Sequence, residues 1–243
     1  MGNGREMKKV VSVNFINHLY TPDQSSRNKT IIIFHGWGSS VNNYDELAEY
    51  FSSIGFKVIV PEIIFHDSRH KLENHFLKEV TQEYFWKTIF RSIDDATLLF
   101  KELGVSEKDV ILMGISMGGF IANGIYAKGN NFAGLINING SGSFLLSEKI
   151  FRANDQRPEL SHEEINEINF YNPRGKNISN SPILLMHGEL DTVVSIDGQK
   201  DYFKFLMDSG TLCDVVFNVY KNVNHSLTEE MLQDLKQWLE EKH

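Results

Sequence analysis

The stretch VILMGISMGG at residues 110–119 determines the fold that we expect. Its first four residues form a continuous apolar run, as in a strand that is buried on both faces of a parallel sheet. A helical pattern follows over residues 117–128. Between the two, Gly114 and Gly118 flank Ser116, and their missing Cβ atoms allow a sharp turn. The stretch therefore predicts a strand–turn–helix unit that exposes the Ser116 hydroxyl at the carboxyl end of a strand.

Similar short runs of apolar and β-branched residues occur at 31–34, 56–60, 135–138, 183–186 and 215–219. Helical patterns alternate with them, at residues 43–54, 79–103 and about 227–241. This alternation predicts crossover connections and a mostly parallel central sheet flanked by helices. Residues 8–20 alternate more, which predicts one or two antiparallel strands at the edge. We expect a single α/β domain over residues 1–243.

Two segments interrupt this alternation. Residues 61–78 follow the second parallel strand, and residues 141–182 follow the strand at 135–138. The longer segment has helical patterns near 144–153 and 162–170. A long insertion with helical patterns favours a small cap over a linker. We therefore expect a helical cap of about residues 141–182 inside the single domain.

Composition and charge exclude several classes of protein. The chain has 24 Lys and Arg against 32 Asp and Glu, a net charge of −8, so no basic stripe for nucleic acid is expected. Its single cysteine, Cys213, cannot form a disulfide within the chain, which favours a reducing compartment. The first residues lack the apolar core of a secretory signal, and no apolar run approaches the length of a membrane span. These features predict a cytoplasmic protein without a membrane span.

Two side chains later in the chain complete the chemistry that Ser116 needs. A serine hydroxyl is a poor nucleophile without a base to take its proton. His225 lies after the last apolar strand and just before the C-terminal helical pattern, where it could serve as that base. Asp191 lies just past the strand at 183–186, where a carboxylate would orient the imidazole. Three other acids are rivals for this role: Glu189, Asp197 and Asp214.

Backbone amides near Ser116 are candidates for binding a developing oxyanion. One is the amide of Met117, directly after the serine. Another lies in the loop His35-Gly-Trp-Gly-Ser-Ser40, which follows the first parallel strand. Its two glycines let the backbone turn and aim the Trp37 amide inward. We therefore expect the backbone N–H groups of Trp37 and Met117 to form a two-donor oxyanion hole.

Four motifs together resemble those of serine hydrolases with the α/β-hydrolase fold. They are HGWGSS at 35–40, GISMG at 114–118, HGELDTVV at 187–194 and NVNHS at 222–226. The stretch PEIIFHDSR at 61–69 also resembles small bacterial esterases of the dienelactone hydrolase and prolyl-oligopeptidase-like branch. The resemblance implies a carboxylesterase-type serine hydrolase with a catalytic triad of Ser116, Asp191 and His225. Such a triad requires no cofactor and no metal.

The segment at 61–78 is rich in histidine. His66 and His70 are four residues apart and could share a helix face as metal ligands. His75 and two acids, Asp67 and Glu73, lie close to them in the sequence. We expect these side chains to be polar residues at the surface or at a pocket rim rather than metal ligands.

The expected reaction is hydrolysis of a small or medium carboxylic ester through an acyl-enzyme on Ser116. The same chemistry would serve an aminopeptidase-like enzyme or a thioester hydrolase. Acidic residues of the cap are candidates for binding a substrate amine, although a solvated helix face is the simpler interpretation: Glu159, Glu163, Glu164 and Glu167. Aromatic residues of the cap are candidates for core packing or for an acyl pocket: Phe144, Phe151, Phe170 and Tyr171.

A third interpretation is a non-catalytic ligand-binding protein on the same fold. It predicts that a member of the triad is missing, whereas candidates for all three are present. The expected partner is a small-molecule ester, with no nucleic acid and no membrane span. The sequence leaves open whether the chain forms a homodimer.

Overall fold

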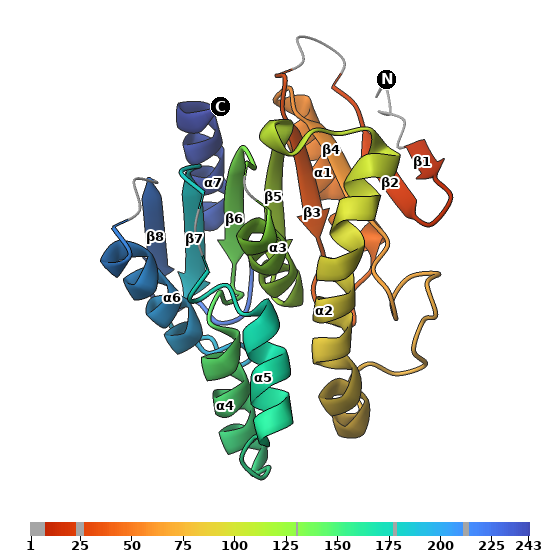
Figure 1. Ribbon diagram of the computed structural model, residues 1–243. Helices are drawn as coiled ribbons and strands as arrows, with labels where there is room; N and C mark the ends of the chain where they lie inside the picture. Colours follow the sequence, from red (N-terminus) through yellow and green to blue (C-terminus); the bar gives the residue numbers. More distant parts are fainter. Residues whose placement is uncertain (1–7, 23–26, 130, 177–178, 211–213) are drawn as a thin grey trace.

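The computed structural model describes residues 8–22, 27–129, 131–176, 179–210 and 214–243, and Cys213 and the N-terminal residues 1–7 lie outside them (Figure 1). Eight strands form one sheet in the order β1-β2-β4-β3-β5-β6-β7-β8. Their bounds are β1 (Lys8–Val11), β2 (Ile16–Tyr20), β3 (Thr30–Phe34), β4 (Lys57–Pro61), β5 (Val110–Ile115), β6 (Gly134–Ile138), β7 (Ile183–Gly188) and β8 (Val215–Tyr220).

The sheet is mostly parallel, as predicted. Each neighbouring pair from β4 through β3, β5, β6 and β7 to β8 is parallel. Strands β1 and β2 add an antiparallel edge, with β2 paired to β4. The carboxyl ends of the parallel strands therefore meet at one edge of the sheet, which is the lower edge in Figure 1.

Helices cover both faces of this sheet. Their bounds are α1 (Asp45–Ser53), α2 (Lys78–Leu103), α3 (Met117–Lys128), α4 (Phe144–Asp155), α5 (His162–Tyr171), α6 (Ile196–Asp208) and α7 (Glu229–Lys242), with 3₁₀ turns η1 (Val41–Tyr44) and η2 (Glu107–Asp109). Buried residues of α2, α3 and α6 belong to one apolar cluster, and those of α1 and α7 belong to another. The two clusters lie on opposite faces of the sheet.

Strand β3 shows why the apolar runs are continuous. Every residue of this strand is buried. Ile32 and Phe34 pack into the cluster with α2 and α3, whereas Ile31 and Ile33 pack into the cluster with α1 and α7. Because alternate side chains of a strand point to opposite faces, a strand covered on both sides carries apolar side chains at successive positions, here Ile31 to Phe34.

The two insertions lie at the carboxyl edge of the strands. Helices α4 and α5 connect β6 to β7 and extend below the sheet in Figure 1, beside the start of α2. Ser161 caps α5 in a capping box with Glu164. The segment between β4 and α2 has no regular secondary structure and crosses the same edge.

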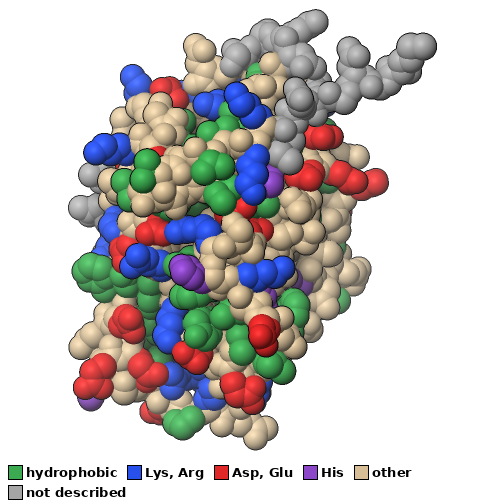
Figure 2. Space-filling model, turned by 90° about the vertical axis from the view of Figure 1, so that its right-hand side faces the viewer, with side chains coloured by type: hydrophobic (Ala, Val, Ile, Leu, Met, Phe, Trp, Pro, Cys, Tyr) green, Lys and Arg blue, Asp and Glu red, His purple; other side chains and the backbone are tan. Residues whose placement is uncertain are grey.

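The described part of the chain contains no helix that is both long and apolar enough to cross a membrane. On the face of the molecule drawn in Figure 2, the side chains of Lys and Arg are interspersed with those of Asp and Glu.

Candidate active site

Ser116 occupies the turn between β5 and α3 in a strained conformation. Its φ is 58° and its ψ is −123°, a region that residues with a side chain rarely occupy. The Ser116 N–H donates to the Ile138 carbonyl at 2.9 Å, and the Ser116 carbonyl accepts from Gly119 N–H at 2.8 Å. These bonds hold the turn in place, so that the hydroxyl stands above the carboxyl end of β5.

The glycines on either side of Ser116 are required by close backbone contacts. A Cβ atom on Gly114 would lie 1.9 Å from the Gly118 carbonyl oxygen. A Cβ atom on Gly118 would lie 1.9 Å from the Phe34 carbonyl oxygen. Both distances are far below van der Waals contact, so the turn can form only with glycine at these two positions.

The structure brings Ser116, His225 and Asp191 into one hydrogen-bonded row. His225 Nε2 lies 2.8 Å from Ser116 Oγ, and His225 Nδ1 lies 2.7 Å from Asp191 Oδ2. A carboxylate only accepts hydrogen bonds, so Nδ1 carries the proton and Nε2 accepts from the serine hydroxyl. Asp191 follows β7 and His225 follows β8, so both come from the edge where Ser116 lies.

Asp191 is held as a buried carboxylate. Its Oδ1 accepts the amides of Val193 and Val194, each at 2.9 Å. Burial by itself would raise the pKa of Asp191, but hydrogen bonds from His187 and His225 outweigh it, so the pKa lies well below the usual range. Asp191 is therefore ionised at neutral pH and faces the imidazole of His225.

His187 is a neighbour of the row that the sequence did not single out as a site residue. Its Nε2 lies 3.2 Å from Asp191 Oδ2 and 2.9 Å from the Val194 carbonyl oxygen. The His187 side chain is fully buried. His187 and His225 therefore both contact the same carboxylate oxygen, Asp191 Oδ2. The four-residue spacing of His187 and Asp191 was the available signal for this contact.

The two amides expected to bind an oxyanion border Ser116. Met117 is the first residue of α3, so its N–H has no acceptor within the helix. In the loop after β3, the Gly36 amide donates to Tyr44 Oη at 3.1 Å. The Trp37 N–H meets no acceptor within the described ranges of the chain, and Gly36 approaches so closely that a Cβ there would lie 3.3 Å from Ser116 Cβ. Neither amide therefore has an acceptor among the described residues.

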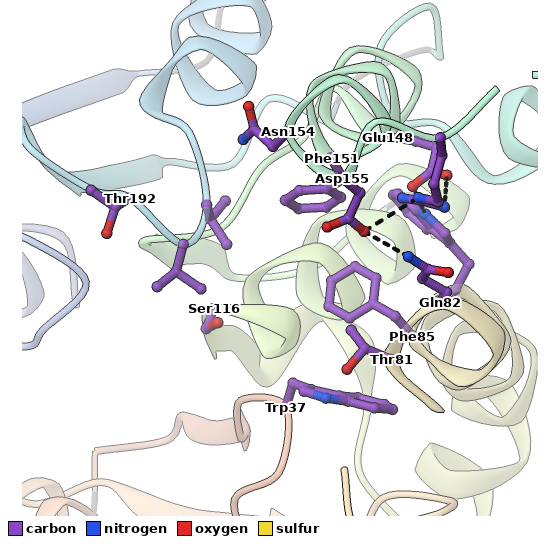
Figure 3. Close-up of a pocket in the computed structure, with 14 residues that line it drawn as sticks. Trp37, Thr81, Gln82, Phe85, Ser116, Glu148, Phe151, Asn154, Asp155 and Thr192 are labelled. Carbon is purple, nitrogen blue, oxygen red and sulfur yellow. Dashed lines mark hydrogen bonds and ion pairs between the residues drawn. The ribbon is translucent and has the colours of Figure 1, made fainter. Parts of the chain in front are cut away.

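Ser116 opens into a cavity of about 290 Å³ (Figure 3). Its apolar wall combines residues of the loop after β3, of α2, of α4 and of the loop after β7: Trp37, Phe85, Phe151, Val193 and Val194. The Phe85 ring lies edge-on to Phe151 and to Trp37, with centroids 5.7 and 5.9 Å apart. The space beside the serine is therefore an apolar pocket bounded by aromatic rings.

The side of the cavity away from Ser116 is polar but internally paired. Glu148 accepts hydrogen bonds from Trp86 Nε1 at 2.8 Å, from Arg152 Nε at 2.8 Å and from Arg157 Nη1 at 3.0 Å. Asp155 accepts from Gln82 Nε2 at 2.9 Å, as Figure 3 shows. The buried Glu148 is thus balanced by two arginines, and the partly exposed Asp155 pairs with Arg157.

The aromatic residues of the cap that were candidates for core packing or an acyl pocket occupy different environments. Phe151 lines the cavity, whereas Phe144 is buried in the core and Phe170 is 67% exposed. Tyr171 stacks on Phe90 with centroids 4.2 Å apart.

The four acidic residues of the cap that the sequence suggested for binding an amine do not line the cavity that contains Ser116. Three of them are exposed: Glu159, Glu163 and Glu167. The fourth, Glu164, accepts the Ser161 amide and pairs with Arg152.

The prediction for the histidine-rich segment was wrong for two of its histidines. His66 is 0% exposed and His75 is 7% exposed, so neither is a surface residue. His70 is exposed and shares no helix with His66, since the segment is irregular. Among the described residues, no group of three or more His, Cys, Asp or Glu side chains could hold a metal ion.

A mostly parallel sheet with a serine on the sharp turn after its central strand and a histidine after its last strand defines an α/β-hydrolase. The chain belongs to the dienelactone hydrolase family, whose match covers residues 15–237. It is a hydrolase of this family.

Individual relatives agree with this assignment. Esterase YjfP of Escherichia coli (strain K12) is 26% identical over 217 residues, covering 83% of this chain and 84% of that protein. The crystal structure of esterase PE8 is similar with a TM-score of 0.67 at 17% identity, covering 95% of this chain and 100% of that one. An acylaminoacyl peptidase of Pyrococcus horikoshii has a TM-score of 0.72 at 17% identity, covering 98% of this chain but 41% of the peptidase. The two structures share the fold of this chain.

Proposed function

We propose that the protein hydrolyses small to medium carboxylic esters through an acyl-enzyme on Ser116. The observation that carries the proposal is the row in which His225 lies 2.8 Å from Ser116 Oγ and 2.7 Å from Asp191. The family membership and the esterase among its relatives support an ester as substrate.

The first half of the reaction forms the acyl-enzyme. His225 Nε2 takes the proton of Ser116 as Oγ attacks the ester carbonyl carbon. The carbonyl oxygen becomes an oxyanion, which the amides of Trp37 and Met117 would bind. The tetrahedral intermediate then collapses, His225 gives its proton to the leaving alcohol, and the bond between the acyl carbon and the alkoxy oxygen breaks.

The second half releases the acid. A water molecule gives a proton to His225 Nε2 and attacks the acyl carbon, and the bond to Ser116 Oγ breaks as the proton returns to the serine. Throughout, Asp191 keeps the imidazole in the tautomer that accepts at Nε2 and stabilises the imidazolium that forms in each half. The sum is one ester and one water converted into one acid and one alcohol.

The cavity supports a substrate of limited size. Its volume of about 290 Å³ lies at the lower end of the usual range for small-molecule sites, roughly 300–1,000 Å³. Its walls near Ser116 are aromatic and aliphatic, so a short hydrocarbon chain is the part of the ester that they would bury.

The test is hydrolysis of p-nitrophenyl acetate, butyrate and octanoate by the wild type, by Ser116→Ala and by Ser53→Ala. Ser53 is exposed at the end of α1, so its variant is a matched control. We expect Ser116→Ala to lose at least about 10³-fold in kcat, with Ser53→Ala unchanged. A fluorophosphonate should add its mass to Ser116 alone. Turnover by Ser116→Ala at the rate of the wild type would refute the proposal.

The same assay separates the alternatives. An amide hydrolase should cleave an aminoacyl p-nitroanilide at a rate comparable with the ester, and a thioester hydrolase should prefer the thioester of the same acid. A ligand-binding protein should react with neither the esters nor the fluorophosphonate.

A further inference from the structure

The loop that carries the Trp37 amide is tethered on both sides of that amide. The Gly36 N–H donates to Tyr44 Oη, and the Gly38 N–H donates to His66 Nε2 at 3.0 Å. Further along, the Val41 N–H donates to Asp67 Oδ1 at 2.9 Å. The Trp37 amide lies between two fixed amides and has no acceptor of its own in the described part of the chain. Its direction is therefore set by its neighbours.

His66 has the chemistry that this tether requires. Its Nε2 accepts from Gly38 N–H, so the ring proton is on Nδ1, which donates to the Ile64 carbonyl at 3.1 Å. A protonated His66 would present an N–H to another N–H. Burial, with a smaller contribution from the nearby His35, lowers the pKa of His66 to about 3. The side chain therefore stays an acceptor at any pH at which the enzyme would work.

The rings around His66 hold the side chain of Trp37 as well. The indole lies edge-on to the rings of His66 and His75, with centroids 5.1 Å from each. Trp37 Nε1 donates to the His75 carbonyl oxygen at 2.9 Å. Backbone and side chain of Trp37 are thus both fixed by the same segment, which leaves the peptide no free rotation.

The segment at residues 62–77, which carries His66, contains several residues with a strained backbone. Phe65, Asp67 and His70 have φ angles of 63°, 49° and 57° without being glycine. Such residues persist where the surrounding contacts over-determine them, and they often cluster at functional sites. Here Asp67 also accepts from His35 Nε2 at 2.9 Å, so the strained segment is bonded to both ends of the Trp37 loop.

We propose that His66 is a positioning residue for catalysis, which aims the Trp37 amide at the oxyanion by accepting the Gly38 N–H. The inference rests on the proposed function, since it assigns the Trp37 amide to the transition state. His66 itself does not touch the substrate. It acts through Gly38 and Trp37, so its loss should lower kcat more than it changes KM.

The experiment compares His66→Gln with His66→Asn, and uses His70→Asn as the control. A Gln carbonyl oxygen reaches the position of Nε2 and can accept from Gly38, whereas the shorter Asn reaches only the position of Nδ1. His70 lies in the same segment, is exposed and has a positive φ that Asn tolerates. The melting temperature, kcat and KM of each variant are measured with p-nitrophenyl butyrate, together with the Ki of a trifluoromethyl ketone whose adduct carries an oxyanion.

We expect His66→Asn to lose about 10- to 100-fold in kcat, the range for a displaced oxyanion donor, with KM changed less than about threefold. The Ki of the trifluoromethyl ketone should rise by a similar factor. His66→Gln should recover kcat to within about threefold, and His70→Asn should match the wild type.

Several results would overturn the inference. One is a folded His66→Asn with unchanged kcat, and another is an equal loss in both His66 variants. A loss confined to KM would have the same meaning. If His66→Asn does not fold, a folded His66→Gln that loses more than about tenfold in kcat refutes the inference. Failure of the proposed function shows separately, as turnover that does not depend on Ser116.

Discussion

Ser116 Oγ lies 2.8 Å from His225 Nε2, although 109 positions separate the two residues in the chain. The contact exists because β5 and β8 run parallel within one sheet, so the turns that follow them lie at the same edge. Asp191 joins them from the turn after β7. A hydrogen bond between residues so distant in sequence makes the chemistry of the site depend on the register of the whole sheet.

The role proposed for Asp191 can be tested by Asp191→Asn. The side-chain carbonyl oxygen of the Asn should still accept the backbone N–H groups of Val193 and Val194. The neutral side chain cannot stabilise the imidazolium of His225. We expect kcat for p-nitrophenyl butyrate to fall about 10³- to 10⁴-fold while the melting temperature changes little. Asp197→Asn is the control, because Asp197 is exposed at the start of α6. An Asp191→Asn variant with more than a tenth of the activity would contradict the role.

The close contacts of the serine turn predict a large difference between two glycine substitutions. Gly114→Ala would place Cβ 1.9 Å from the Gly118 carbonyl oxygen, so we expect the free energy of unfolding in urea to fall by at least about 3 kcal/mol. Gly104 has a φ of 62° but nothing within 4 Å, so Gly104→Ala should lose only about 1–2 kcal/mol. Equal losses in the two variants would show that the turn adapts to the extra atom.

The aromatic wall predicts the preference for chain length. Phe151→Ala removes a ring that faces Phe85 across the cavity, so the pocket should accept a longer acyl chain. We expect the ratio of kcat/KM for octanoate over acetate to rise about tenfold, since each additional buried CH₂ contributes about 0.8 kcal/mol. Phe170→Ala, at an exposed position away from the cavity, should leave the ratio unchanged. An unchanged ratio in Phe151→Ala would place the acyl chain elsewhere.

The depressed pKa of His66 predicts a pH dependence of stability. Its folded-state pKa of about 3 lies below the ordinary value of 6.5, so the unfolded chain binds the proton first as the pH falls. The stabilisation is complete above pH 6.5 and is lost between pH 6.5 and about 3. From pH 7 to 5, the wild type should lose about 1–2 kcal/mol more free energy of unfolding than His66→Gln. The free energies come from urea unfolding at each pH. An equal loss between pH 7 and 5 in the wild type and in His66→Gln would contradict the assignment.

Much of the fold could be predicted from the sequence, because the sheet is covered on both faces. Buried parallel strands such as β3 and β7 produce continuous apolar runs, which stand out against amphipathic helices. Helix α6 was not predicted, and its composition explains why. Its buried face includes Gly198 and Gln199 beside Tyr202 and Leu206, so the hydrophobic spacing is broken by two residues without an apolar side chain.

The members of the row at Ser116 could also be located, because each follows a strand and the carboxyl ends of parallel strands share one edge. The hydrogen bond that ties the Trp37 loop to His66 could not be predicted from the sequence. Residues 62–77 have no helical or strand period. Their path depends on residues in the left-handed backbone conformation, such as Phe65 and Asp67, which no local pattern indicates. The hydrogen bond from Gly38 to His66 joins two loops, and only the folded chain places them together.

The cap has a consequence for how such enzymes diversify. Phe151, which lines the cavity beside Ser116, belongs to α4 between β6 and β7, whereas Ser116, Asp191 and His225 belong to turns outside that insertion. Part of the cavity wall is therefore encoded in a different stretch of sequence from Ser116, Asp191 and His225. If the proposed function holds, replacement of residues 141–182 during evolution could change the substrate range while Ser116, Asp191 and His225 are retained.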